Sequence, residues 1–195
     1  MLLSNGEEPV ASGSTLASRS ARAALRDGSA DLHAAVEVAL AIDRLAEPDV
    51  YYRFLQRMEA VGNAVEQATR PHLAEAILDP LRGDLARLRL DLLDLSAARA
   101  RPSAAPDLRI AEPAEAWGAI YVMEGARLGG RIIARRAAAS FGISADFGGR
   151  YLHDDGEPAG VRWRRFLAQL EGALTEIERR ERALGATRRT FALFF

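Results

Sequence analysis

The chain has 195 residues, of which 49% are hydrophobic, and its formal net charge is −1. This length predicts one domain with a sizeable core, and the balanced charge gives no reason to expect nucleic acid or a membrane as a partner. The absence of cysteine excludes disulfides, zinc–thiolate sites and iron–sulfur clusters. All 26 basic residues are arginine, so any anion held by a side-chain cation is held by a guanidinium. Neither a membrane span of about 20 apolar residues nor a signal sequence is recognisable, and we expect a cytoplasmic protein.

The N-terminal part begins with polar and small residues and then becomes helical. Residues 1–18 are rich in Ser, Gly, Ala and Glu without periodicity, so we expect a flexible tail followed by a single domain over residues 19–195. A first helix is predicted from about Ser20, with an apolar stripe that reaches Leu40. Gly28-Ser29 interrupts this helix, and we expect a bend or a new helix start there.

The middle of the chain is predicted to be helical with two interruptions. A helix covers residues 49–69, and a short one begins at Pro71. Asp79-Pro80 predicts a turn before a leucine-rich helix over residues 81–100. Three prolines within residues 101–113 then indicate a connection across the surface.

The last third contains a glycine-bearing helix over residues 117–135, a helix stop at Phe141-Gly142 and a loop over residues 145–158. A long helix over residues 159–183 and a shorter one from Ala186 complete the chain. No window shows the alternation of a β-strand. The predicted fold class is therefore all-α, a compact single domain of about seven or eight helices.

The glycine-bearing helix carries Gly125, Gly129 and Gly130, and each interior glycine destabilises a helix by roughly 0.5–1 kcal/mol relative to alanine. Gly125 and Gly129 are four residues apart and therefore share a face. A face without side chains lets another group lie against the backbone and lets the helix bend. The residues alone leave two partners open: another helix in a small-xxx-small contact, or a large flat ligand.

His33 is the strongest candidate ligand among the three histidines. Glu37 follows one turn later on the same face, so its carboxylate can orient the imidazole as carboxylates do for metal-bound histidines. An ordinary surface pair worth about 0.2–0.5 kcal/mol is the alternative. Arg26 lies two turns before His33, whereas His72 and His153 are expected to face solvent.

One ligand would account for the single candidate metal ligand, the bare helix face and the exclusive use of arginine. A haem bound through its iron to His33, with one face against the glycines and its propionates paired with arginine, satisfies all three features.

Three segments resemble the bacterial branch of the haem oxygenase family. Residues 33–37 (HAAVE), with Arg26 upstream, are similar to its proximal helix. Residues 124–130 (EGARLGG) resemble its distal motif, usually of the form EGSxLGG. Residues 161–167 (VRWRRFL) are similar to the W-x-x-F-L helix that follows. The likeness runs from residue 20 to residue 174 in the same order. Members of this kind produce biliverdin and are associated with bacterial phytochromes or with iron acquisition.

The resemblance implies the compact helical haem-oxygenase fold, with haem between the proximal and distal helices. His33 would be the axial ligand and Glu37 its supporting partner. Gly125 and Gly129 would contact the distal face of haem and leave room for dioxygen, which gives them a catalytic role, while Gly130 would serve packing.

The resemblance also suggests which arginines meet the propionates. Arg26 would meet one propionate, and Arg162 or Arg165 the other. The chain departs from the family at Ala126, where many members carry an aspartate that serves proton delivery through water. Arg127 is expected to point to solvent, because burying its charge is costly.

The implied activity is oxidative opening of haem to biliverdin with release of iron and carbon monoxide, and haem is both substrate and cofactor. Dioxygen and external electrons are consumed, the electrons coming from a partner such as a ferredoxin or a flavin reductase. A phytochrome is the biliverdin acceptor that family analogy suggests. The arginines among residues 162–189 form either a docking surface for an acidic reductase or a solvated charged face.

Three other readings of the sequence remain to be weighed. A non-catalytic haem-binding, trafficking or sensing protein would use the same His33 and the same glycines. A helical bundle without a cofactor would use the glycines only for packing. A di-iron carboxylate site fits poorly, since it needs paired Glu-x-x-His motifs and the chain has none.

Overall fold

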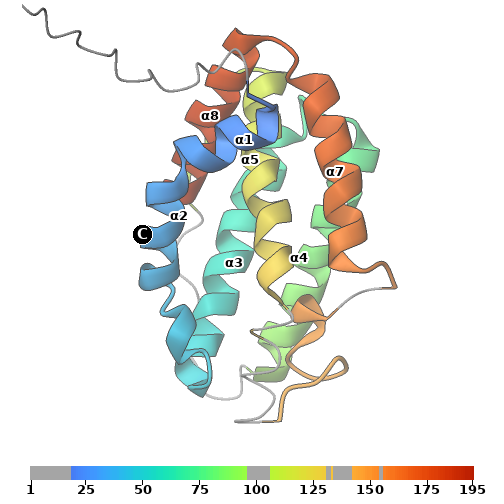
Figure 1. Cartoon of the computed structure of the whole chain (residues 1–195). Helices are drawn as coiled ribbons and strands as arrows, with labels where there is room; N and C mark the ends of the chain where they lie inside the picture. Colours follow the sequence, from blue (N-terminus) through green and yellow to red (C-terminus); the bar gives the residue numbers. More distant parts are fainter. Residues whose placement is uncertain (1–18, 96–105, 131–132, 134–141, 154–155) are drawn as a thin grey trace, which may run out of the picture.

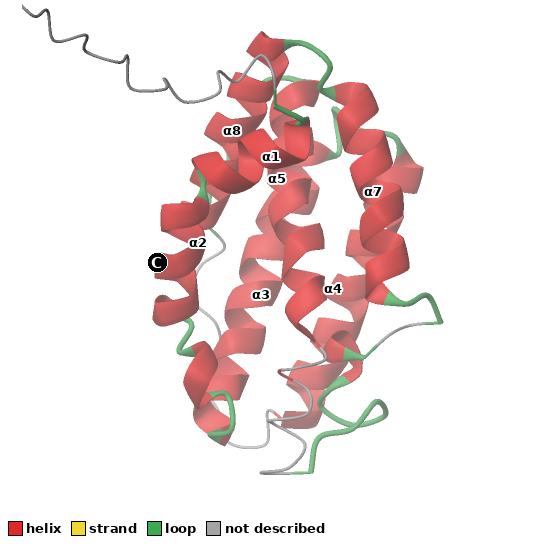
Figure 2. Cartoon of the chain, in the orientation of Figure 1, coloured by secondary structure: helices red, strands yellow, loops and turns green. Residues whose placement is uncertain are grey.

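The computed structural model describes residues 19–95, 106–130, 133, 142–153 and 156–195. Within them it contains seven α-helices and no β-strand (Figure 2), which confirms the all-α prediction. The predicted tail over residues 1–18 lies outside the described residues, as do the predicted C-terminal end of the helix over residues 81–100 and nearly all of residues 131–141. No helix in the described part of the chain combines the length and the apolar character needed to cross a membrane.

The first predicted helix is divided into two, α1 (Ala21–Gly28) and α2 (Ala30–Ala39). The buried Ser29 joins them, and its hydroxyl donates a hydrogen bond of 2.7 Å to the carbonyl of Leu25. A serine that bonds the preceding turn in this way competes with the regular helix ladder. The interruption predicted at Gly28-Ser29 is therefore present, and it separates Arg26 and His33 onto different helices.

The helices α3 (Pro48–Thr69) and α4 (Glu75–Leu95) form the next pair. No helix begins at Pro71, and the predicted turn at Pro80 is wrong because this residue lies inside α4. Four leucines on both sides of it are buried along one face: Leu78, Leu81, Leu85 and Leu88. Burying each contributes roughly 1.5–3 kcal/mol. Together they outweigh the cost of about 3 kcal/mol for a proline within a helix.

The helix α5 (Pro113–Ala126) is buried on nearly every side and packs along α8 (Ile177–Ala192). A Cβ atom on Gly118 would lie 2.0 Å from the carbonyl oxygen of Ala183. The buried Thr187 hydroxyl also donates a hydrogen bond of 2.9 Å to the carbonyl of Gly118. The two backbones can approach this closely only because residue 118 has no side chain.

The single helix predicted over residues 159–183 is instead divided: α7 (Ala159–Ala173) ends at Ala173, and α8 begins at Ile177 rather than at the predicted Ala186. Leu174 is fully buried at the break. The Arg180 guanidinium donates hydrogen bonds of 2.8 Å to the carbonyls of Leu174 and Thr175, which satisfies acceptors that the end of a helix leaves free. Figure 1 shows α2 and α7 on opposite sides of α5, and α7 packs against α5.

Candidate functional site

His33 stands on α2 with 62% of its side chain exposed. Its Nδ1 atom lies 3.7 Å from Oε1 of Glu37, which is an electrostatic contact and too long for a hydrogen bond. The ring meets Phe191 of α8 edge-on, with ring centroids 5.9 Å apart. The imidazole is thus supported by an aromatic ring and open to a ligand. Sequence analysis missed Phe191, although the aromatic run at residues 191–195 was a visible signal.

Arg26 lies on α1 and is exposed, and its Nε atom donates a hydrogen bond of 2.7 Å to Asp27. Nearby on α5 is Tyr121, whose pKa is raised, chiefly by burial. The positive charges of Arg22 and Arg26 counteract this rise, while Asp27 adds to it. Arg26 on α1 therefore interacts electrostatically with a buried phenol four residues before Gly125.

The glycines that follow Glu124 differ in how closely other residues approach them. The α-helix ends at Ala126 and continues as the 3-10 turn η3 (Arg127–Gly129), so the expected bend takes the form of a change in helix type. A Cβ atom added at Gly129 would meet nothing within 4 Å in the described part of the chain. None of the described helices covers this face, which argues against helix packing as the role of Gly129.

Gly125 and Gly130 have different surroundings. A Cβ atom on Gly125 would approach only the ring of Trp163, at 3.9 Å, whereas one on Gly130 would lie 3.2 Å from the carbonyl oxygen of Leu152. Gly130 is therefore the packing residue of the motif. Trp163 comes from α7 and lies 5.5 Å, centroid to centroid, from Tyr121. The W-x-x-F-L segment thus forms an aromatic wall beside Gly125.

Arg162 is not at the surface of the site. It is 5% exposed, and its Nε and Nη2 atoms donate hydrogen bonds of 2.8 and 2.5 Å to the Glu124 carboxylate. Nη2 also donates a 2.8 Å hydrogen bond to Asp84. Burial lowers the pKa of Arg162, but the hydrogen bond and charge of Glu124 outweigh this and raise it. Because its donors are directed at two buried carboxylates, Arg162 is a poor candidate for a propionate.

The prediction that Arg127 points to solvent is wrong. Its side chain is buried, its guanidinium donates to the carbonyl of Tyr151, and its Nε atom lies 3.4 Å from Oδ1 of Asp84. The prediction assumed that a buried guanidinium would be unpaired and therefore costly. The guanidinium of Arg127 instead has the buried carboxylate of Asp84 beside it. Sequence analysis also missed Asp84, although a carboxylate on the leucine stripe of α4 signals a buried partner.

Arg165 remains a candidate for a propionate because it is exposed, and it pairs with Glu157. His72 and His153 are half-buried and do not simply face solvent. Nε2 of His72 lies 3.1 Å from the carbonyl oxygen of Ile110, and Nδ1 of His153 lies 2.7 Å from that of Gly149.

The helix α2 is tied to α8 by a bidentate ion pair. Arg188 donates hydrogen bonds of 2.7 and 2.9 Å to the two carboxylate oxygens of Asp31, and another of 2.7 Å to the carbonyl of Gly28. The hydrogen bond from Arg188 lowers the pKa of Asp31 below its ordinary value of 3.8. A carboxyl group whose pKa is lowered by folding stabilises the folded protein at pH values above 3.8. This stabilisation is lost as the pH falls through the pKa of Asp31 in the folded protein.

We therefore expect Asp31→Asn to have a lower melting temperature than the wild type at pH 6, and the difference to close as the pH falls below about 4. Thermal unfolding of both proteins between pH 6 and pH 3 measures this. Asp107→Asn, at an exposed position, is the control and should follow the wild type throughout. A difference in melting temperature between Asp31→Asn and wild type that does not change with pH would contradict the prediction.

Comparisons with known proteins identify relatives of this chain. The family model described as Heme oxygenase matches residues 19–195. A curated protein named heme oxygenase from Xanthomonas campestris pv. campestris (strain 8004) is 40% identical over 78 residues, which cover 40% of this chain and 46% of that protein. The chain thus aligns with about half the length of this relative.

Two solved structures share the fold. The NO- and CO-bound heme oxygenase from Neisseria meningitidis superposes with a TM-score of 0.70 at 19% sequence identity, over 90% of this chain and 88% of that one. Heme oxygenase from Leptospira interrogans gives a TM-score of 0.65 at 15% identity, over 90% of this chain and 97% of that one.

Proposed function

Because the chain belongs to the haem oxygenase family, we propose that it opens haem oxidatively to biliverdin and releases iron and carbon monoxide. The observation that carries the proposal is that the chain has both an exposed imidazole on α2 and, at the end of α5, a glycine backbone at Gly129 that no described residue covers. His33 would then hold the iron, and Gly125 and Gly129 would leave room for the ring.

The residues present fit a haem. The uncovered backbone at Gly129 is flanked by Leu128, which is 44% exposed, and by the exposed Ala126, so that the distal segment offers a small, apolar surface. The aromatic rings of Trp163 and Phe191 add apolar walls on α7 and α8. Apolar and aromatic side chains together with one imidazole suit a flat iron macrocycle.

The arginines at the rim would hold the propionates. We assign Arg26, which interacts electrostatically with Tyr121, to one propionate and Arg165 to the other. Arg165 would leave its ion pair with Glu157 and pair with the propionate instead. Arg162 is left out of this assignment because Glu124 and Asp84 already accept its hydrogen bonds.

When bound, haem would supply both the iron that activates dioxygen and the ring that is oxidised. Glu37 would then orient the His33 imidazole, and the glycines would keep side chains away from the reacting face while restricting the space above it. With Ala126 in place of an ionisable residue, protons would reach the site through water held by backbone groups of the distal segment.

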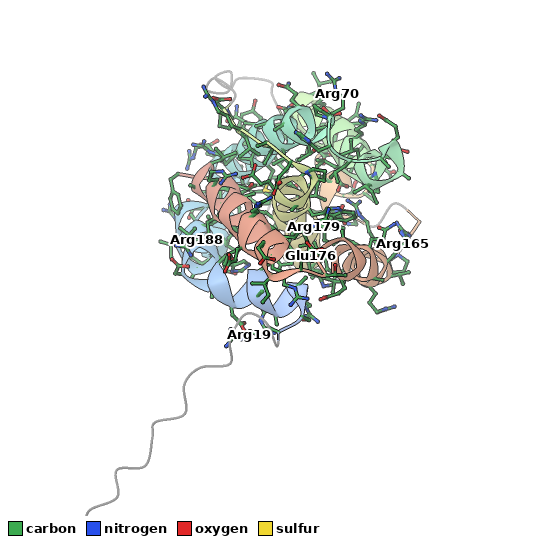
Figure 3. The ribbon with its side chains drawn as sticks, turned by 90° about the horizontal axis from the view of Figure 1, so that it is seen from above. Arg19, Arg70, Arg165, Glu176, Arg179 and Arg188 are labelled. Carbon is green, nitrogen blue, oxygen red and sulfur yellow. The ribbon has the colours of Figure 1, made fainter. Side chains whose placement is uncertain are left out.

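Electrons and product require partners, and we propose an external donor of the ferredoxin or flavin reductase type and, by family analogy, a phytochrome as one acceptor of biliverdin. The arginines of α7 and α8 form a weaker docking surface than the sequence suggests. Arg182, Arg188 and Arg189 are paired with acidic residues, and Figure 3 shows Arg165 and Arg188 on opposite sides of the molecule. The positive charge is therefore dispersed.

The proposal is tested by adding hemin to the purified protein and then ascorbate in air. We expect a one-to-one complex whose Soret band decays while the absorbance of biliverdin rises, with the product identified by chromatography. A complex whose Soret band persists would instead indicate a protein that stores, transports or senses haem. Failure to bind hemin would favour a helical bundle without a cofactor.

A further inference from the structure

A buried cluster of four charges lies directly behind the distal glycines. Asp84 comes from α4, Glu124 from the end of α5, Arg127 from η3 and Arg162 from α7, and each is at most 5% exposed. Glu124 immediately precedes Gly125, and Arg127 lies between Gly125 and Gly129. The cluster thus holds the segment at its start, through Glu124, and in its middle, through Arg127.

We propose that this cluster fixes the position of the Gly125–Gly129 backbone, so that Glu124 and Arg162 are positioning residues for the haem face opposite His33. The inference rests on the proposed function, since it assigns the fixed backbone to haem. It adds a role for side chains that do not touch the ligand.

The geometry of the pairs supports positioning. Both Nε and Nη2 of Arg162 bond the Glu124 carboxylate, and a two-point contact of this kind restricts rotation as well as distance. Nη2 is shared with Asp84, which links the end of α5 to α4. Arg127 in turn lies within 3.4 Å of Asp84 and donates to the Tyr151 carbonyl. Four elements therefore converge on one short segment.

Electrostatics indicate why charges are used here. A buried ion pair seldom stabilises a protein more than well-packed apolar residues would, but removing one partner leaves an uncompensated charge. A rotation of η3 would separate Arg127 from Asp84, and a shift of α5 would separate Glu124 from Arg162. Apolar side chains at the same place would allow the glycine-rich segment to take several positions, because their contacts have no direction. The charged pairs favour a single position of this segment.

The first measurement uses the protein without haem, so that it is independent of the proposed function. Glu124→Gln and Arg162→Lys are compared with matched controls at surface pairs, Glu115→Gln on α5 and Arg182→Lys on α8. Amide hydrogen exchange is followed over residues 124–130. We expect exchange in this segment to be at least about tenfold faster in the two cluster variants and unchanged in the controls.

The second measurement uses the complex of each protein with hemin. The stretching frequency of carbon monoxide bound to the reduced complex reports the distance and polarity of the distal backbone. We expect it to shift in both cluster variants and to match the wild type in both controls. If wild-type protein binds no hemin, the proposed function fails while the exchange data still test the cluster.

A double variant, Glu124→Leu with Arg162→Met, separates positioning from stability. Replacing the pair with apolar side chains should restore much of the melting temperature lost in the single variants. We expect exchange at residues 124–130 to remain fast and the carbon monoxide frequency to remain shifted. Recovery of all three properties together would overturn the proposal, as would wild-type exchange in both single variants.

Discussion

Replacing His33 with alanine is expected to abolish histidine-type ligation of hemin and to weaken hemin binding by more than the roughly 10–100-fold seen when only a supporting partner of a metal-bound histidine is lost. The side chain is 62% exposed, so its removal should leave the fold intact, and surface substitutions of this kind change stability by about 0.5 kcal/mol or less. The absorption spectrum and a hemin titration measure both effects.

The structure provides a matched control and a rescue. His72→Ala removes a half-buried imidazole whose Nε2 lies near the Ile110 carbonyl, and it should leave the hemin spectrum unchanged. Imidazole added to His33→Ala should restore the histidine-type spectrum, because it can enter the space beside Phe191 that the side chain leaves. A variant at position 33 that binds hemin with the wild-type spectrum and affinity would remove the basis of the proposed function.

Replacing Gly118 with alanine is expected to destabilise the protein by at least about 3 kcal/mol, because the added carbon would lie 2.0 Å from the carbonyl oxygen of Ala183. Neither atom belongs to a flexible side chain, so α5 and α8 must separate, and the hydrogen bond from Thr187 to Gly118 would be strained as well. For a chain of this size the loss corresponds to a fall in melting temperature of roughly 6–12 °C.

Gly172→Ala is the control for this substitution. Gly172 lies in α7, and a Cβ atom there would meet nothing within 4 Å in the described residues. Alanine should therefore be neutral or stabilise the helix by up to about 1 kcal/mol. Equal melting temperatures for the two variants, measured by calorimetry, would show that α5 and α8 do not approach as closely as described.

These two residues illustrate what local sequence can predict. The EGARLGG segment could be recognised because its glycines interrupt a strong helical pattern within seven residues. Gly118 stands alone in an ordinary apolar helix, and its role depends on α8, which follows about 65 residues later. An interior glycine can make room for a ligand or for another helix. Gly118 makes room for α8, whereas Gly129 has no described residue against it and is the one that we propose for the ligand.

The error at Arg127 and the unexpected burial of Arg162 have a common physical origin. Both predictions treated an arginine as a lone charge that would seek solvent or a ligand. The position of Asp84 on the leucine stripe of α4 indicates that it is buried, but nothing in the sequence shows which arginine pairs with it, because the partners lie far apart in the chain. The break between α7 and α8 was missed for a similar reason, since Arg180 and the burial of Leu174 define it through tertiary contacts.

The exclusive use of arginine has a consequence for the tolerance of the protein to alkali. A guanidinium keeps its proton beyond about pH 12, so base cannot discharge the cations beside Asp84 and Glu124, whereas a lysine amine in that place would be neutralised near pH 10. The buried cluster should consequently keep its positive charges in alkaline buffers that would discharge a lysine at the same place.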